Sequence, residues 1–147
     1  MAESDIVSTK ILFTETFYPA DLKNNIICFH ATQAVEKLLK GYIISNGKEI
    51  GMTHNLNDLN EIAAKIDCSF SNIREHCALL NTLIPNLKYR AKKSITKQNM
   101  DELIKSLENI CNFPPIKTMR NSFGKNHKYE IVTEVIANSA KSNPAGG

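Results

Sequence analysis

The sequence predicts an all-α protein, an up-and-down bundle of four to five helices with little or no sheet. Every strong hydrophobic periodicity in the chain repeats at three to four residues, the spacing of a helix with one buried face. The 147 residues suffice for one domain with its own core, and the 42% hydrophobic and 22% charged content is ordinary for a soluble globular protein. We expect one helical domain over residues 1–140 and a disordered tail over residues 141–147.

The first expected helix covers residues 4–16. It should end before Tyr18-Pro19, because the residue preceding a proline is pushed out of the helical region. The second helix, over residues 26–44, organises the rest of the chain. If it begins earlier, Asp21 lies in its first turn, where a carboxylate suits the exposed amides. Asn46-Gly47 is a usual stop signal and should end it.

This central helix has two faces. At 100° per residue, one half of the helical wheel holds the apolar side chains Ile27, Ala31, Ala34, Val35, Leu38, Leu39 and Tyr42. The other half holds a polar stripe at positions i, i+3, i+4 and i+7, formed by Gln33, Glu36, Lys37 and Lys40. These four side chains are close enough to act on one ligand or one partner surface. The alternative is an ordinary solvated helix face.

Three further helical segments follow. Thr53 should cap a helix over residues 56–66, and Ser71 should cap another that Pro85 stops. Residues 98–111 form the clearest amphipathic pattern of the chain, and Phe113-Pro114-Pro115 should then break the chain and turn it. His54 at the start of the first of these helices has a functional interpretation and a simpler one, as a capping or packing residue.

The cysteines and the N-terminal residues indicate the compartment. The four cysteines, at positions 28, 68, 77 and 111, form no Cys-x-x-Cys pair, and we expect reduced, buried thiols. His and Cys do not occur at zinc-ligand spacing, so we expect no metal and no other cofactor. The first residues carry acids rather than a basic region, and no apolar run is long enough to span a bilayer. A cytoplasmic protein without a membrane segment is therefore expected.

The net charge of +3 is unevenly distributed. Residues 1–87 hold seven Lys and Arg against ten Asp and Glu, a net charge of −3, whereas residues 88–128 hold ten against three, a net charge of +7. Within the basic part, Tyr89 is surrounded in sequence by Lys88, Arg90, Lys92 and Lys93. Cations beside an aromatic ring suit a nucleic acid, which offers phosphates to the former and bases to the latter. A solvated loop with scattered lysines is the alternative.

The run HATQAVEKLLKGYI over residues 30–43, followed after a short polar loop by THNLNDL, resembles the HEPN family of small helical proteins. The family is named for higher eukaryotes and prokaryotes nucleotide-binding, and it characteristically carries Gln-Ala-Val-Glu-Lys and Thr-His-x-Leu at these places. The resemblance covers roughly residues 29–112. It departs from many relatives at Tyr89-Arg90-Ala91, where they have Arg-Tyr-Pro.

A second motif lies beyond the proline break. Arg120, Asn121, Gly124 and His127 resemble the Arg-x4-6-His signature of the ribonuclease branch of the family, and the Arg-Asn-x-x-Gly-x-x-His pattern of some phage abortive-infection proteins. In a metal-independent ribonuclease, a histidine transfers the proton of the 2′-hydroxyl or of the leaving oxygen, and a guanidinium holds the charge on phosphorus. The resemblance assigns these roles to His127 and Arg120, with Asn121 orienting either group. In the usual layout the motif lies near Arg90, so ordinary surface residues are the alternative.

Two main hypotheses follow. The first is a HEPN-type, metal-independent endoribonuclease of the toxin or phage-defence kind, with catalytic Arg120, Asn121 and His127. In this case Tyr89, Arg90 and Lys93 would grip the RNA, and the resemblance implies a homodimer and a nucleotidyltransferase-like antitoxin partner. The second is a non-catalytic module that holds a nucleotide or a partner chain through Gln33, Lys37, Lys40 and Arg90. A plain helical adaptor is a third interpretation.

Overall fold

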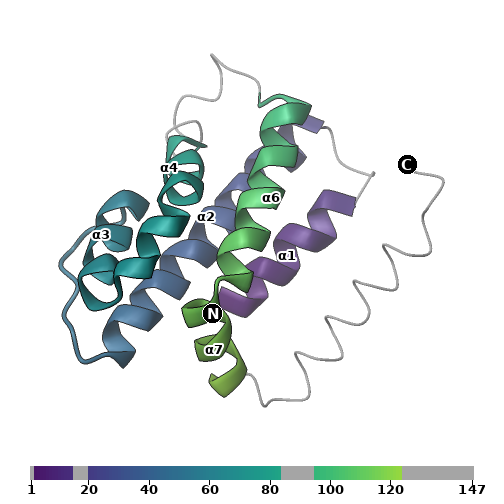
Figure 1. The fold of residues 1–147 in the computed structure, drawn as a ribbon. Helices are drawn as coiled ribbons and strands as arrows, with labels where there is room; N and C mark the ends of the chain where they lie inside the picture. Colours follow the sequence, from purple (N-terminus) through teal and green to yellow (C-terminus); the bar gives the residue numbers. More distant parts are fainter. Residues whose placement is uncertain (1, 15–19, 84–94, 124–147) are drawn as a thin grey trace.

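The computed structural model describes residues 2–14, 20–83 and 95–123 (Figure 1). In chain order the elements are α1 (Ala2–Thr14), α2 (Ala20–Ser45), α3 (Leu56–Ile66), the 3-10 helix η1 (Cys68–Ile73), α4 (Arg74–Leu83), α6 (Lys97–Asn112) and α7 (Pro114–Phe123). No strand occurs within these three ranges, and the predicted all-α bundle is confirmed. Among the helices described, none combines the length and the apolar character that a membrane span requires.

α2 is the centre of the bundle, and α1, α3, α4, α6 and α7 all contact it. Its predicted apolar face is buried from Ile27 to Leu39, and Tyr42 is half-buried against Phe70, with ring centroids 4.5 Å apart. Each fully buried aliphatic side chain stabilises the fold by about 1.5–3 kcal/mol, so this face supplies a large share of the core. The helix begins at Ala20, which places Asp21 in its first turn as expected.

The predicted stop at Asn46-Gly47 is confirmed. Gly47 has a φ of 73°, in the left-handed region that favours glycine. The Gly47 N–H donates to the carbonyl of Ile44 at 2.9 Å, and the Lys48 N–H donates to that of Ile43 at 3.1 Å. These bonds satisfy carbonyls that the helix end would otherwise leave without a partner. The chain then returns along α2 toward the start of α3.

The caps of α3 and of the next segment differ from the prediction. Asn55, not Thr53, caps α3, and its side chain accepts hydrogen bonds from the backbone of the first turn. Asp67, not Ser71, caps the following segment, which starts as η1 before α4 begins at Arg74. Both predictions are wrong because several capping residue types occur close together, and the backbone conformation decides which one reaches the free amides.

α6 has the predicted amphipathic face, with Met100, Leu103 and Leu107 buried. Its start is fixed by a capping box, in which Thr96 and Asn99 each accept a hydrogen bond from the other's backbone N–H. This reciprocal pair satisfies two free amides at the helix start.

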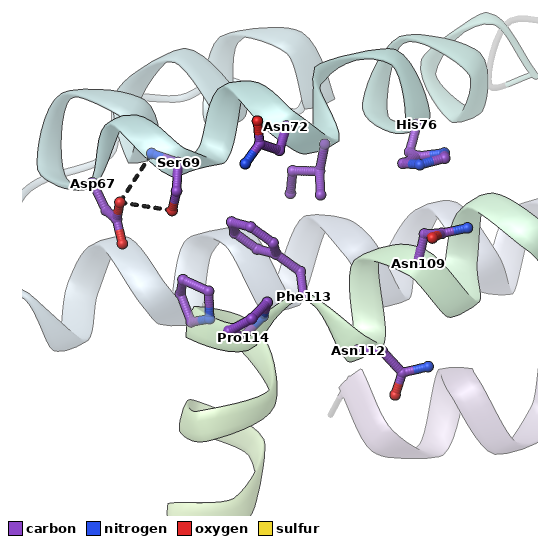
Figure 2. Close-up of a pocket in the computed structure, with 10 residues that line it drawn as sticks. Asp67, Ser69, Asn72, His76, Asn109, Asn112, Phe113 and Pro114 are labelled. Carbon is purple, nitrogen blue, oxygen red and sulfur yellow. Dashed lines mark hydrogen bonds between the residues drawn. The ribbon is translucent and has the colours of Figure 1, made fainter.

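The break after α6 is one residue long. Phe113 is extended, and α7 begins at Pro114, because the fixed φ of proline and its missing N–H suit the first position of a helix. The break was predicted, but the helix that follows it directly was not. The Phe113 ring lies between η1 and the start of α7 (Figure 2) and packs edge-on against Phe70, with ring centroids 4.9 Å apart.

All four cysteines are free thiols. Burial raises the pKa of Cys28 and of Cys77 to about 12 and that of Cys111 to about 11, so these thiols stay protonated at neutral pH. Cys68 is exposed, and the expectation of a buried thiol is wrong for this residue. It is the first residue of η1, and the buried positions of that short helix are Phe70 and Ile73 instead.

Candidate functional site

The polar stripe of α2 lies on the partly exposed side of the helix. Gln33, Lys37 and Lys40 are all half-buried. Glu36 differs, because only 8% of it is exposed. The prediction placed it with the solvated residues, but it lies at the border of the polar half, where the loop before α3 covers it. The stripe is therefore a surface of amide and ammonium groups with a carboxylate beneath it.

One end of the stripe is joined to α1 through Asp5, which is buried. Its carboxylate lies 3.0 Å from His30 Nδ1 and 2.5 Å from Lys37 Nζ. An ionised carboxylate only accepts hydrogen bonds, so the ring nitrogen and the ammonium are the donors. Burial raises the pKa of Asp5, but the hydrogen bonds from Lys37 and His30 outweigh this effect, and the pKa lies below 3.8. The hydrogen bond to Asp5 raises the pKa of Lys37.

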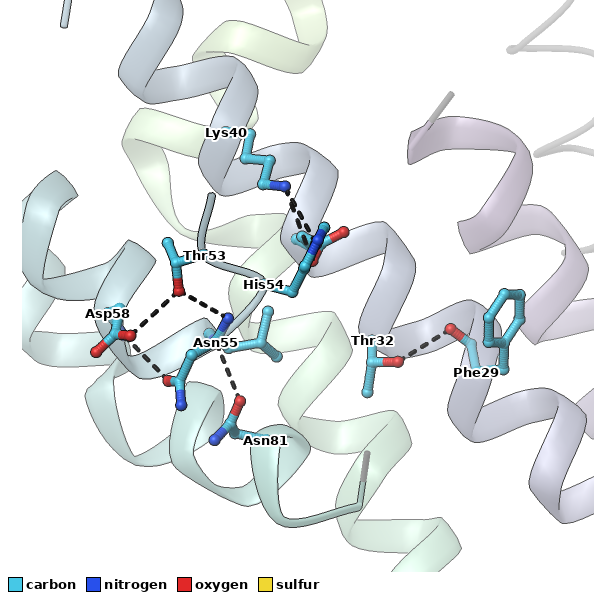
Figure 3. A network of polar contacts seen from close by, with 10 residues as sticks. Phe29, Thr32, Lys40, Thr53, His54, Asn55, Asp58 and Asn81 are labelled. Carbon is cyan, nitrogen blue, oxygen red and sulfur yellow. Dashed lines mark hydrogen bonds and ion pairs between the residues drawn. The ribbon is translucent and has the colours of Figure 1, made fainter. Parts of the chain in front are cut away.

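The other end is joined to the loop before α3 through Glu36. His54 Nδ1 lies 2.8 Å from Glu36 Oε1, and Lys40 Nζ lies 3.9 Å from the same oxygen. Figure 3 shows Lys40 and His54 meeting beside α2, with Nζ and Nδ1 3.5 Å apart. Because the Nδ1 proton points to Glu36, this nitrogen cannot also accept from Lys40. Lys40 therefore keeps ammonium donors for another acceptor.

Asp5 and Glu36 cancel the formal charges of Lys37 and Lys40, but the exposed fractions of these side chains differ. The side chains of the two carboxylates are only 11% exposed, whereas those of Lys40, Lys37 and His54 are 25%, 40% and 77% exposed. An ammonium has three N–H donors, and only some of them can point to the carboxylate beneath. The side chain of Gln33 makes no hydrogen bond to another residue in the described part of the chain. An anion approaching from solvent therefore meets donors before it meets the carboxylates.

Arg120, the phosphate-binding residue of the second motif, is held differently. Its Nε and NH2 groups donate to the two carboxylate oxygens of Glu3 at 2.6 and 2.8 Å, and NH1 donates to the carbonyl of Cys111 at 3.3 Å. Such a two-bond arginine–carboxylate pair is among the stronger polar contacts in proteins. The hydrogen bond to Glu3 raises the pKa of Arg120. The guanidinium thus ties α7 to α1 and to the end of α6.

Of the other residues of that motif, the structure describes Asn121. Asn121 follows Arg120 on α7 and is exposed. His127 lies outside the described residues, as do Tyr89, Arg90 and Lys93. The pairing of Arg120 with His127 therefore stays a prediction. Within residues 2–14, 20–83 and 95–123, no group of three or more His, Cys, Asp or Glu could hold a metal ion.

The sequence alone did not identify three residues that make these contacts: Glu3, Asp5 and His30. His30 lies seven residues before Lys37, so it shares the face of α2 on which the stripe lies, and this spacing was a usable signal. Glu3 and Asp5 lie on α1, and no local pattern connects them to residues of α2 or α7. Only the packing of the helices shows these pairs.

Comparison with known proteins identifies the family. The profile of the HEPN domain matches residues 1–117, most of the chain. The chain belongs to the HEPN family. The matched range of the HEPN domain contains the whole α2 stripe with Asp5 and His54, and it ends before Arg120. No curated protein and no solved structure matches the chain in the corresponding comparisons.

Proposed function

We propose that this HEPN protein is a binding module that holds the phosphate groups of a nucleotide, free or within RNA, on the polar stripe of α2. The observation that carries this proposal is the position of Lys37, Lys40 and His54, whose side chains are 40%, 25% and 77% exposed and whose side-chain nitrogens each lie within 4 Å of a buried carboxylate. Side chains held in place before binding lose less conformational freedom when a ligand arrives.

The spacing of the lysines suits a phosphate. Lys37 and Lys40 are three residues apart on α2, so their Cβ atoms are about 5–6 Å apart, and both ammonium groups can reach oxygens of one phosphate or of two adjacent ones. Gln33 lies four residues before Lys37 on the same face and adds an amide N–H. The stripe therefore offers three side chains with donors to one ligand.

The cancelling charges determine the strength of this interaction. Because Asp5 and Glu36 offset the two lysines, long-range attraction of an anion to the stripe is weak. Binding should depend on short-range hydrogen bonds and change little as the salt concentration rises. The basic segment over residues 88–97 lies mostly outside the described residues, and its contribution to RNA binding stays a prediction.

Calorimetric titration of the full chain with ATP, GTP and a short RNA tests the proposal. The double variant that carries both Lys37→Gln and Lys40→Gln should bind these ligands about tenfold more weakly, because two charge-assisted hydrogen bonds are lost. Glu36→Gln should strengthen it by about threefold, since one negative charge disappears while the amide oxygen still accepts from His54.

A matched control is Lys65→Gln with Lys105→Gln, which changes the net charge equally at exposed positions of α3 and α6. Affinity should stay close to that of the unaltered chain. Equal loss in both double variants would mean that only the overall charge matters, and the α2 site would be rejected. No heat with any of the three ligands would reject the binding module and leave the helical adaptor and the endoribonuclease as interpretations.

The metal-independent endoribonuclease is the second candidate. It is supported by membership of the HEPN family. For this activity the guanidinium of Arg120 would have to release the carboxylate of Glu3 before it could bind a phosphate. Total RNA incubated with the protein in EDTA should be cut, and Arg120→Ala or His127→Ala should slow the cutting about a hundredfold. Undiminished cutting by both variants would remove this candidate. A homodimer and a nucleotidyltransferase-like antitoxin are further proposals that rest on the family resemblance.

A further inference from the structure

A groove separate from the α2 stripe lies where the turn after α3, the start of α4, the end of α6 and the start of α7 meet (Figure 2). Its volume is about 600 Å³. No residue of the α2 stripe lines it. We call it the asparagine groove, because Asn72, Asn109 and Asn112 are among the residues around it. Any ligand bound here is independent of one bound to the stripe.

The groove contains side chains that can only accept hydrogen bonds from a ligand. Asp67 Oδ1 already accepts from the N–H of Ser69 at 2.9 Å and from its hydroxyl at 2.7 Å, while Oδ2 has no partner among the described residues. The hydrogen bonds from Ser69 lower the pKa of Asp67, so the carboxylate is ionised at neutral pH. The hydroxyl proton of Ser69 is already donated, which leaves its oxygen as an acceptor. A ligand that contacts Asp67 and Ser69 must therefore supply donors, whereas the amide groups of the asparagines can both donate and accept.

The charge of the groove also favours one class of ligand. Among the described residues, no lysine or arginine lines it, and Asp67 is the one carboxylate. His76 has Nδ1 engaged 3.0 Å from Ser106 Oγ. A phosphate would meet a fixed negative charge without a neighbouring arginine or lysine, whereas a cation would be attracted.

Part of the lining of the groove is apolar. Phe113 and Pro114 contribute to it (Figure 2), together with Pro115 and Ile73. The prolines have no N–H, so this part of the backbone presents no donor. A planar group could lie against this surface while its edge reaches the polar side chains opposite.

We propose that the asparagine groove binds an arginine side chain presented by a partner protein. A guanidinium is planar and weakly hydrated, so it can stack on an aromatic or apolar floor, and its donors lie in one plane toward Asp67 and the asparagine oxygens. A lysine ammonium is compact and strongly hydrated, and it fits such a floor less well. The groove is larger than one side chain and has room for the residues next to the arginine.

Nuclear magnetic resonance of the ¹⁵N-labelled full chain provides the test. The main probes are N-acetyl-arginine amide and N-acetyl-citrulline amide, and the second has a shape similar to the first but no charge. The lysine analogue and guanosine are tested as additional ligands. The arginine probe should shift the backbone amides of Ile73, His76 and Asn109 in a saturable way. The citrulline and lysine probes should bind about fivefold more weakly.

Asp67→Asn tests the carboxylate without removing the cap, because asparagine also accepts from the backbone of Ser69. It should weaken the arginine probe about fivefold, whereas Asp101→Asn, an exposed change on α6, should not. Equal binding of arginine and citrulline, or an unchanged affinity of Asp67→Asn, would overturn the proposal. So would guanosine shifting these amides when arginine does not. The probe comparison on the unaltered chain keeps the test valid even if the variant folds poorly.

Discussion

Arg120 and the lysines of α2 both offer a cation to a phosphate, but they are held in opposite ways. Arg120 uses three of its groups on Glu3 and on the carbonyl of Cys111. Lys37 and Lys40 each meet a carboxylate with one ammonium group, and their side chains are 40% and 25% exposed. The three hydrogen bonds of Arg120 connect three helices, whereas an ammonium that is held at one carboxylate keeps donors for a ligand.

Arg120→Ala gives the largest expected effect. It leaves the Glu3 carboxylate without its partner and should lower the free energy of unfolding by about 2–3 kcal/mol, less than for a fully buried pair because both side chains keep some exposure. Urea denaturation followed by circular dichroism measures the change. A variant as stable as the unaltered chain would show that the ion pair with Glu3 contributes nothing to the free energy of unfolding. The guanidinium of Arg120 could then leave Glu3 and bind a phosphate.

Arg74→Ala is the matched control for this prediction. Arg74 pairs with Glu61 at 3.1 Å, but both side chains are 58% exposed. The loss in unfolding free energy should stay below about 0.5 kcal/mol, because solvent screens an exposed pair. Similar losses in the two variants would mean that burial does not distinguish the two ion pairs.

Asp5→Asn tests the connection between the stripe and α1, with a smaller expected effect. The folded pKa of Asp5 lies below 3.8, so its contribution to stability is present above that pH and is lost as the pH falls through the folded pKa. The pKa of Lys37 is raised above 10.5, so its contribution is present below that pH and is lost as the pH rises through the folded pKa.

Between these limits the unaltered chain should be more stable than Asp5→Asn by about 1 kcal/mol, since the half-exposed Lys37 reduces the strength of the pair. Urea denaturation of both proteins from acid to neutral pH measures this difference. A difference that stays constant as the pH falls below 3.8 would show that the Asp5 charge does not stabilise the fold.

The helical faces could be predicted because their signal is local. The apolar residues of α2 and α6 recur at the helical period, and their burial follows directly from that pattern. The caps could not be predicted as well. Thr53 and Asn55, or Asp67 and Ser71, are each suitable residue types, and only the backbone path decides between them. Pro114 was interpreted as a break, although proline also suits the first position of a helix.

The candidate site could be predicted only in part, for a related reason. Gln33, Lys37 and Lys40 lie on one helix, so their spacing alone predicted a common surface. The carboxylate of Asp5 comes from a different helix, and its place beside Lys37 depends on how α1 packs on α2. The burial of Glu36 depends in the same way on the loop that carries His54. A periodic pattern describes one helix at a time, so it does not predict contacts between different elements.

The ion pair of Glu3 with Arg120 also bears on the order of folding. The two residues are 117 positions apart in the sequence. Bringing such distant residues together restricts more of the chain than the local contacts of α2 with α3, so this connection should form after the central helices have packed. α7 should accordingly open at lower free energy than the middle of the bundle, and hydrogen exchange would show this as an early loss of protection of its backbone amides.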